Sequence, residues 1–147
     1  IDMENYSKQA EQNFLNGYNC AQSVFMAYAE DFGFDKNTAL KLSSSFGGGM
    51  GRLREVCGAV SAMFAILGLE YGYTQNNDDE IKAKHYERIQ QAAQKFKEKH
   101  CTIICRDLLG VEEEKISYIP SKRTAEYYEK RPCAEFIKTA CEILSEM

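Results

Sequence analysis

Residues 44–71 read SSFGGGMGRLREVCGAVSAMFAILGLEY, and they join a glycine-rich segment to a long apolar one. Its second part, from Leu53 to Tyr71, is apolar on almost every side of a helix, and Gly72 follows it. A helix of this kind is buried in the core of a protein. The uncharged run 56–69 is shorter than the about 20 apolar residues that a membrane span needs. We therefore predict a central buried helix over about residues 53–71.

The chain on both sides of this segment also has helical periodicity. Tyr6, Ala10 and Phe14 recur at the spacing of one helix face, and a helix there would end near Gly17. Helix-capping residues and turn signals predict further helices that begin near Asn19, Asp35, Asp78, Thr102 and Pro132, and one or two turns over residues 122–131. No stretch predicts a convincing strand. The expected fold is all-α, a single compact domain of about six to seven helices over residues 3–147.

The overall composition limits the partners of this chain. It has 147 residues, 44% of them hydrophobic, a formal net charge of −4 and a pI near 5.3. Such a chain folds, and its acidic balance argues against nucleic acid as a partner, because phosphate binding requires a basic surface. No secretory signal is recognisable in the sequence, so we expect a cytoplasmic protein.

The glycine-rich segment 47–51 raises the question of a phosphate-binding loop. A Walker A loop requires Lys-Ser/Thr after its last glycine and a strand before its first, and neither is present. The dinucleotide pattern G-x-G-x-x-G also fails, because Arg52 or Arg54 stands at its last position. Anion binding at the start of the following helix remains open. The simpler interpretation is a flexible joint between two helices.

Six cysteines are the strongest chemical signal in the sequence: Cys20, Cys57, Cys101, Cys105, Cys133 and Cys141. In a chain of this size without a secretory signal, cysteines bind metal or carry out redox chemistry more often than they form a disulfide framework. The absence of a C-x-x-C pair argues against a thioredoxin-type site and a zinc ribbon. A purely structural role, as small core side chains, is the remaining alternative.

Four of these cysteines fall near predicted helix N-termini. Cys20 follows Asn19, Cys133 follows Pro132, and Cys57 and Cys105 lie in the opening turns of their helices. Free backbone N–H groups and the helix dipole favour a negative charge there, which lowers the pKa of a thiol. Arginines close in sequence would add to this effect: Arg52, Arg54, Arg106 and Arg131. We therefore expect a lowered pKa at all four thiols.

The order and spacing of several short motifs resemble those of one family. The motifs are Asn19-Cys20-Ala21-Gln22, residues 46–51, Cys57-Gly58-Ala59, residues 105–110 and Pro132-Cys133. Together they resemble the redox-active C-GCAxxG-C-C family from about residue 4 to the end of the chain. The chain departs from the literal motif, since Val56 stands before the second cysteine, Gly58 after it, and Ala62 in place of the last glycine.

The resemblance implies an all-helical protein whose four signature cysteines are Cys20, Cys57, Cys105 and Cys133. In the first hypothesis they carry out thiol–disulfide or electron-transfer chemistry as an oxidoreductase-type thiol redox protein, with Cys57 as nucleophile and Cys105 or Cys20 resolving the mixed disulfide. In the second, the same four thiolates hold an iron–sulfur cluster or zinc. The third is a helical interaction module with structural cysteines.

The expected partner of the first two hypotheses is a redox protein or a small thiol or disulfide. Tyr127 and Tyr128 would pack over the site or form a contact in a homo-oligomer. The sequence names neither the substrate nor the pairing of the cysteines, since four cysteines allow three connectivities.

Overall fold

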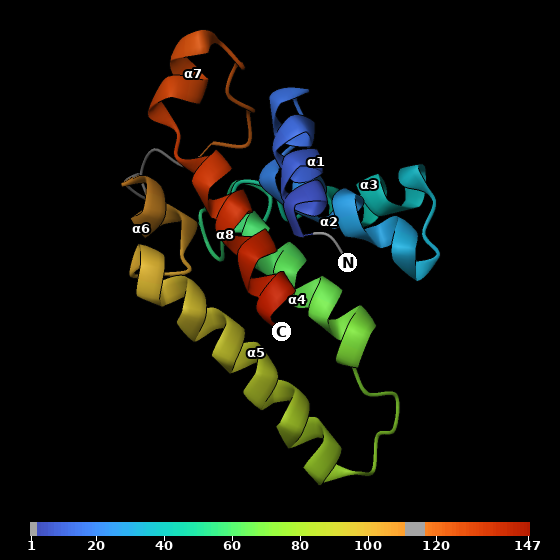
Figure 1. Cartoon of the computed structure of the whole chain (residues 1–147). Coiled ribbons are helices and arrows are strands. Elements are labelled where there is room, and N and C mark those ends of the chain that lie inside the picture. Colours follow the sequence, from blue (N-terminus) through green and yellow to red (C-terminus); the bar gives the residue numbers. More distant parts are fainter. Residues whose placement is uncertain (1–2, 111–116) are drawn as a thin grey trace.

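The computed structural model describes residues 3–110 and 117–147 of the chain. Within these ranges the chain forms helices and no named strand, which confirms the all-α prediction (Figure 1). The elements are α1 (Met3–Leu15), α2 (Cys20–Ala29), the 3-10 helix η1 (Glu30–Phe32), α3 (Lys36–Ser44), α4 (Gly58–Tyr71), α5 (Asp79–His100), α6 (Cys105–Leu109), α7 (Ala125–Lys130) and α8 (Cys133–Glu146). These eight α-helices exceed the expected number because residues 125–130 form a helix behind the cap Thr124.

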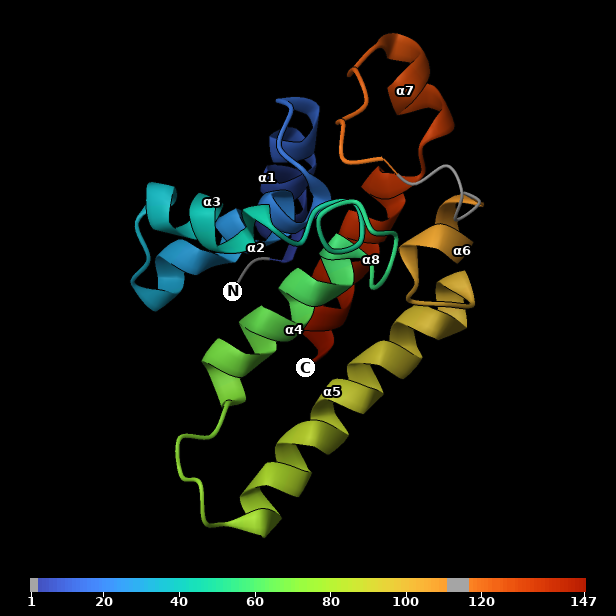
Figure 2. The same cartoon turned by 180° about the vertical axis from the view of Figure 1, so that it is seen from behind.

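The core lies around α4, which packs against α2, α5 and α8 (Figures 1 and 2). Its Val60, Met63 and Leu67 side chains are fully or almost fully buried. They meet buried apolar residues of α2 and α8, such as Val24 and Ile137. Each buried side chain of this kind contributes about 1.5–3 kcal/mol relative to an exposed one. The prediction of a central buried helix is confirmed.

Local capping signals in the sequence place several helix starts correctly. The Asn19 side chain accepts a hydrogen bond from the Gln22 backbone N–H at 2.8 Å, and the Gln22 side chain accepts one from the Asn19 N–H at 3.2 Å. This reciprocal capping box fixes the first turn of α2. Asp35 and Asp78 cap α3 and α5 through their own side chains, each of which accepts a backbone N–H.

The longest helix, α5, lies along one side of the molecule in Figure 2. It buries Ala92 and Phe96 and leaves most of its charged residues exposed. It therefore has the amphipathic pattern of a surface helix. Among the described helices, none combines the length and the apolar character needed to cross a membrane.

The start of the central helix is the main correction to the sequence-based prediction. α4 begins at Gly58 and not at Leu53. The five residues 48–52 all have φ between 57° and 71°, and Arg54 has φ 63°, so the chain winds left-handed before it extends. Val56 then forms an isolated antiparallel bridge with Ile104. This bridge holds residues 53–57 outside the helix, and it also delays the start of α6 from Thr102 to Cys105.

Candidate functional site

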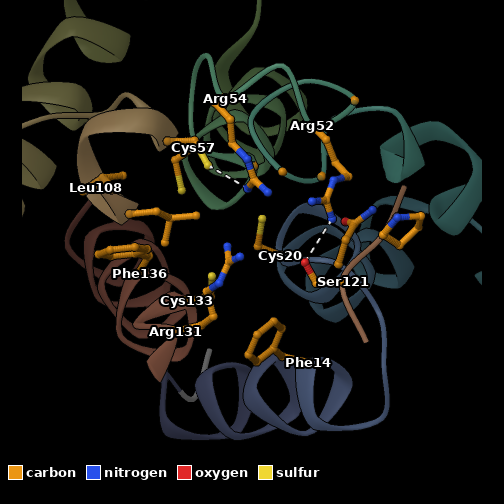
Figure 3. Close-up of a pocket in the computed structure, with 18 of the residues that line it drawn as sticks. Phe14, Cys20, Arg52, Arg54, Cys57, Leu108, Ser121, Arg131, Cys133 and Phe136 are labelled. Atoms are coloured by element: carbon orange, nitrogen blue, oxygen red, sulfur yellow. Dashed lines mark hydrogen bonds between the residues drawn. The ribbon is translucent and has the colours of Figure 1, made fainter. Parts of the chain in front are cut away.

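The four signature cysteines line one pocket, a cavity of about 290 Å³ (Figure 3). Cys20, Cys105 and Cys133 are the first residues of α2, α6 and α8, and Cys57 is the cap residue of α4. Four helices thus begin at the wall of the same cavity. All six cysteines of the chain are free thiols in the structure.

Cys57 and Cys105 reach the pocket through a short pairing of two segments that lie far apart in the sequence. The Cys57 N–H donates to the Ile103 carbonyl at 2.8 Å, and the Cys105 N–H donates to the Glu55 carbonyl at 2.6 Å. These bonds flank the bridge between Val56 and Ile104. The pairing fixes both cysteines by backbone geometry, so neither depends on a flexible loop.

The surroundings of Cys20 favour its thiolate. A hydrogen bond from the Cys57 thiol is the largest cause that lowers the Cys20 pKa, and the backbone N–H groups of Gly48, Ala21 and Ala59 act in the same direction. Together they outweigh the loss of hydration and lower the pKa of Cys20 to about 6. These N–H donors belong to the glycine loop, to the start of α2 and to the start of α4.

The other three thiols of the pocket have raised pKa values, which corrects the expectation from the helix starts. The pKa of Cys57 is raised well above its usual value, because its thiol donates to Cys20 and because Cys57 is only 3% exposed. Burial raises the pKa of Cys133 to about 12. Burial also raises the pKa of Cys105, against the lowering effect of a hydrogen bond from Arg54 Nη1 to Cys105 Sγ at 3.6 Å. At Cys105 and Cys133 desolvation outweighs the helix N-terminus, and at Cys57 the hydrogen bond to Cys20 does so, followed by desolvation.

Two glycines, Gly49 and Gly58, are required by close approaches at the site. A Cβ atom on Gly58 would lie 2.6 Å from Cys20 Sγ and 2.8 Å from the Phe46 carbonyl oxygen. A Cβ atom on Gly49 would lie 2.6 Å from Cys105 Cβ, and φ 71° at this position also favours glycine. The glycines therefore allow the loop and α4 to come into contact with the cysteine-bearing segments.

Arginines surround the thiols, as the sequence partly predicted. Arg52, Arg54 and Arg131 line the pocket. Arg123 was not predicted; its guanidinium donates to the Phe14 and Tyr18 carbonyls at 3.1 Å and 3.0 Å. It lies over the Phe14 ring and connects the segment before α7 to α1. No pattern in the sequence identifies Arg123, because its partners are backbone carbonyls more than 100 positions away.

The two remaining cysteines lie elsewhere. Cys101 is exposed and ends α5 in a left-handed conformation with φ 72°. Cys141 is fully buried in α8 and forms a hydrogen bond with Tyr28. Neither lines the cysteine pocket. Cys101 and Cys105 do not share a helix face, because one ends α5 and the other begins α6.

The arrangement of the donor atoms bears on the metal hypothesis. Within residues 3–110 and 117–147, no three Cys, His, Asp or Glu side chains form a group that could hold a metal ion. The four cysteines share a cavity without the close grouping that a zinc or iron–sulfur site requires. The residues therefore do not fit such a centre in this arrangement.

Comparison with known proteins supports the redox interpretation. The model of the family described as "Putative redox-active protein (C_GCAxxG_C_C)" matches residues 18–147. The chain belongs to this family. No curated protein and no solved structure matches the chain. The match to the C_GCAxxG_C_C family spans all four pocket cysteines and both close-approach glycines, Gly49 and Gly58.

Proposed function

We propose that this protein is a thiol–disulfide oxidoreductase in which Cys20 and Cys57 form the reactive dithiol. The observation that carries the proposal is the lowered pKa of Cys20, about 6, caused first by a hydrogen bond from the Cys57 thiol. At pH 7 a thiol with this pKa is about 90% ionised. The thiolate is the form that attacks a disulfide.

The proposal reverses the roles that the sequence suggested. Cys20 is the attacking thiolate because it is the only pocket cysteine with a lowered pKa. It is also half-buried, whereas Cys57 is buried. Cys57 is the resolving thiol, since it contacts the Cys20 sulfur and holds its proton at neutral pH.

The reaction balances with a disulfide R–S–S–R as the oxidant. The Cys20 thiolate attacks one sulfur atom, the R–S–S–R bond breaks, and R–S⁻ leaves as the mixed disulfide Cys20–S–S–R forms. The proton of Cys57 passes to the departing R–S⁻, and the resulting Cys57 thiolate attacks Cys20 Sγ. The second R–S⁻ leaves, so two protein thiols are oxidised to one disulfide and R–S–S–R is reduced to two thiols.

Backbone donors support this chemistry. The N–H groups of Gly48, Ala21 and Ala59 stabilise negative charge on Cys20. The same groups favour Cys20 as the leaving sulfur when the disulfide is reduced again, because a low thiol pKa makes a good leaving group. Cys105 and Cys133 line the cavity as protonated thiols and take no part in the two steps.

The experiment traps the mixed disulfide. Reduced protein is mixed with 2-hydroxyethyl disulfide, quenched with acid and analysed by peptide mass spectrometry. We expect Cys57→Ser to accumulate the adduct on Cys20, and we expect Cys20→Ser to form none in the pocket. Cys101→Ser is the matched control, since it removes a thiol outside the cavity, and it should behave as the wild type. An adduct on Cys57 in the Cys20→Ser variant at the wild-type rate would contradict the proposal.

A further inference from the structure

The charged side chains that line the cysteine pocket, among the described residues, are all positive. Arg52, Arg54, Arg123 and Arg131 contribute to its lining, and among the described residues the lining contains no Asp or Glu. The whole chain, in contrast, is acidic, with a formal net charge of −4. Cations are therefore concentrated at the place where the reactive thiols lie.

Arg54 is the most informative of these residues. It is 5% exposed, and within the described parts of the chain its side chain has one hydrogen bond, to Cys105 Sγ at 3.6 Å, and no carboxylate partner. Its guanidinium has five N–H donors, and one long bond to a sulfur atom leaves most of them available towards the cavity that Arg54 lines. Burying a charge without a counterion is unfavourable, so this side chain is suited to pair with an anion from outside the protein.

Arg52 and Arg131 add to the positive field and also have no carboxylate partner in the described ranges. Arg52 donates to the Ser117 carbonyl at 3.0 Å and to the Ser121 hydroxyl at 3.4 Å. Arg131 lies over the Tyr127 ring, with its guanidinium carbon 5.4 Å from the ring centroid. Burial, followed by the like charges of Arg54 and Arg131, lowers the pKa of Arg52. The three guanidinium groups repel one another across the cavity.

The backbone at two of these arginines is strained. Arg52 has φ 66° and Arg54 has φ 63°, a region that residues with a side chain rarely adopt. Strain of this kind persists at functional sites, where it orients side chains for a ligand. Figure 3 shows both arginines directed from the loop towards the cavity that Cys20 faces.

Arg123 has a different role from the other three. Its guanidinium donates to two backbone carbonyls of the α1–α2 region and lies over the Phe14 ring, so these contacts fix its orientation. Its contacts hold the segment before α7 against α1 at the edge of the pocket. We therefore assign anion recognition to Arg52, Arg54 and Arg131.

We propose that the disulfide accepted by Cys20 is a small anionic molecule whose carboxylate groups pair with Arg54, Arg52 and Arg131. This inference rests on the proposed exchange function and adds the substrate class. The cavity of about 290 Å³ is at the lower end of the range for small-molecule sites, so it accepts a compact disulfide. Guanidinium groups bind carboxylates through paired N–H donors, which would also orient the disulfide sulfur towards Cys20.

The test compares three disulfides of similar length and different charge. They are 3,3′-dithiodipropionate, 2-hydroxyethyl disulfide and cystamine, which are anionic, neutral and cationic at pH 7. Rates of reduction by the reduced protein are divided by the rates with free dithiothreitol, which removes their intrinsic reactivities. We expect the anionic compound to react about tenfold or more faster than cystamine, and salt to narrow the difference. Equal normalised rates, or a faster reaction with cystamine, would overturn the inference.

Substitutions of the pocket arginines test whether these side chains recognise the anionic disulfide. Arg131→Gln and Arg52→Gln should each reduce, by several-fold, the ratio of the normalised rate with dithiodipropionate to the normalised rate with cystamine. Lys138→Gln is the matched control, because Lys138 is exposed on α8 and its replacement removes the same charge outside the pocket. If Lys138→Gln also lost the preference for the anionic disulfide, the net charge of the protein would explain the preference. The inference that the pocket arginines recognise the anion would then be wrong.

A binding measurement distinguishes failure of this inference from failure of the exchange function. Suberate and 1,6-diaminohexane have the lengths of dithiodipropionate and cystamine but contain no disulfide. We expect calorimetry to show that suberate binds the wild type, binds Arg131→Gln more weakly, and binds more tightly than the diamine. If no disulfide is reduced but suberate binds in this way, the exchange function fails and anion recognition stands. If suberate binds no better than the diamine, the inference is wrong.

Discussion

Cys20 and Cys133 both begin an α-helix, and both line the same pocket, yet their pKa values shift in opposite directions. The pKa of Cys20 is lowered to about 6, whereas the pKa of Cys133 is raised to about 12. Cys20 receives hydrogen bonds from a neighbouring thiol and from backbone N–H groups of three segments. For Cys133 desolvation is the largest effect and raises the pKa. The charges of Cys20 and Cys105 raise it further, and those of Arg131 and Arg123 lower it too little to reverse the shift. A helix start therefore does not activate a thiol here unless other segments supply donors.

The largest difference in exchange rate should appear between two single variants, Cys20→Ser and Cys133→Ser. Cys20→Ser should reduce disulfide exchange to the uncatalysed rate, because a serine hydroxyl is not ionised at neutral pH. Cys133→Ser should change the rate by less than about threefold, since this thiol stays protonated at pH 7. Stopped-flow reduction of 2-hydroxyethyl disulfide measures both. A comparable loss in the two variants would show that the thiols act together.

Gly58→Ala tests whether close approach of α4 maintains the surroundings of Cys20. The added Cβ would lie 2.6 Å from Cys20 Sγ, so we expect α4 to shift, the pKa of Cys20 to rise and the free energy of unfolding to fall by about 1–3 kcal/mol. Denaturant unfolding and thiolate absorbance measure the two effects.

The matched control for this variant lies in the same helix. A Cβ atom on Gly68 would meet no other atom within 4 Å, so Gly68→Ala should leave the pKa of Cys20 unchanged. It should also raise the free energy of unfolding by about 0.5–1 kcal/mol, because alanine favours the helix. A Cys20 pKa that is the same in both variants would contradict the role given to Gly58.

The pH dependence of alkylation tests the hydrogen bond between the two thiols. Because the pKa of Cys20 is about 6, its thiolate fraction falls as the pH falls through 6, and its rate with iodoacetamide should drop about tenfold between pH 7 and pH 5. Cys57→Ala removes the donor that lowers this pKa most. The midpoint should then move to higher pH, towards the ordinary thiol range. An unchanged midpoint would assign the low pKa to the backbone donors alone.

The smallest effect is expected at Cys105. Arg54 lowers the Cys105 pKa by a hydrogen bond and by its charge, while burial raises it more. Arg54→Gln should therefore slow the alkylation of Cys105 at pH 8 by a few-fold and leave that of Cys101 unchanged. Faster alkylation of Cys105 in this variant would show that Arg54 shields the thiol instead of ionising it.

Local signals explain how much of the fold could be predicted. Asn19, Asp35 and Asp78 cap helices through side chains that contact residues three positions away, so short sequence patterns identify them. The apolar run after Cys57 likewise predicts the buried central helix. The family motifs grouped the four pocket cysteines together without any knowledge of their positions in space.

The remaining features depend on contacts that no short pattern contains. The bridge between Val56 and Ile104 joins segments that lie far apart in the sequence, and it keeps the first residues of the predicted helix extended. Left-handed backbone at Met50, Arg52 and Arg54 is unusual for residues with side chains, so propensity argues against it. The pKa values depend on burial and on donors from several elements, and the helix-start argument alone therefore gave the wrong direction for three of the four thiols.

Disulfide mapping of the oxidised protein shows directly whether Cys20 and Cys57 form the reactive dithiol. The reduced protein is oxidised with one equivalent of diamide, alkylated under denaturing conditions, digested and analysed by mass spectrometry. We expect a Cys20–Cys57 disulfide as the first and dominant product, with Cys105 and Cys133 recovered as alkylated thiols. A dominant Cys105–Cys133 disulfide, or a mixture of all three connectivities in similar amounts, would contradict it.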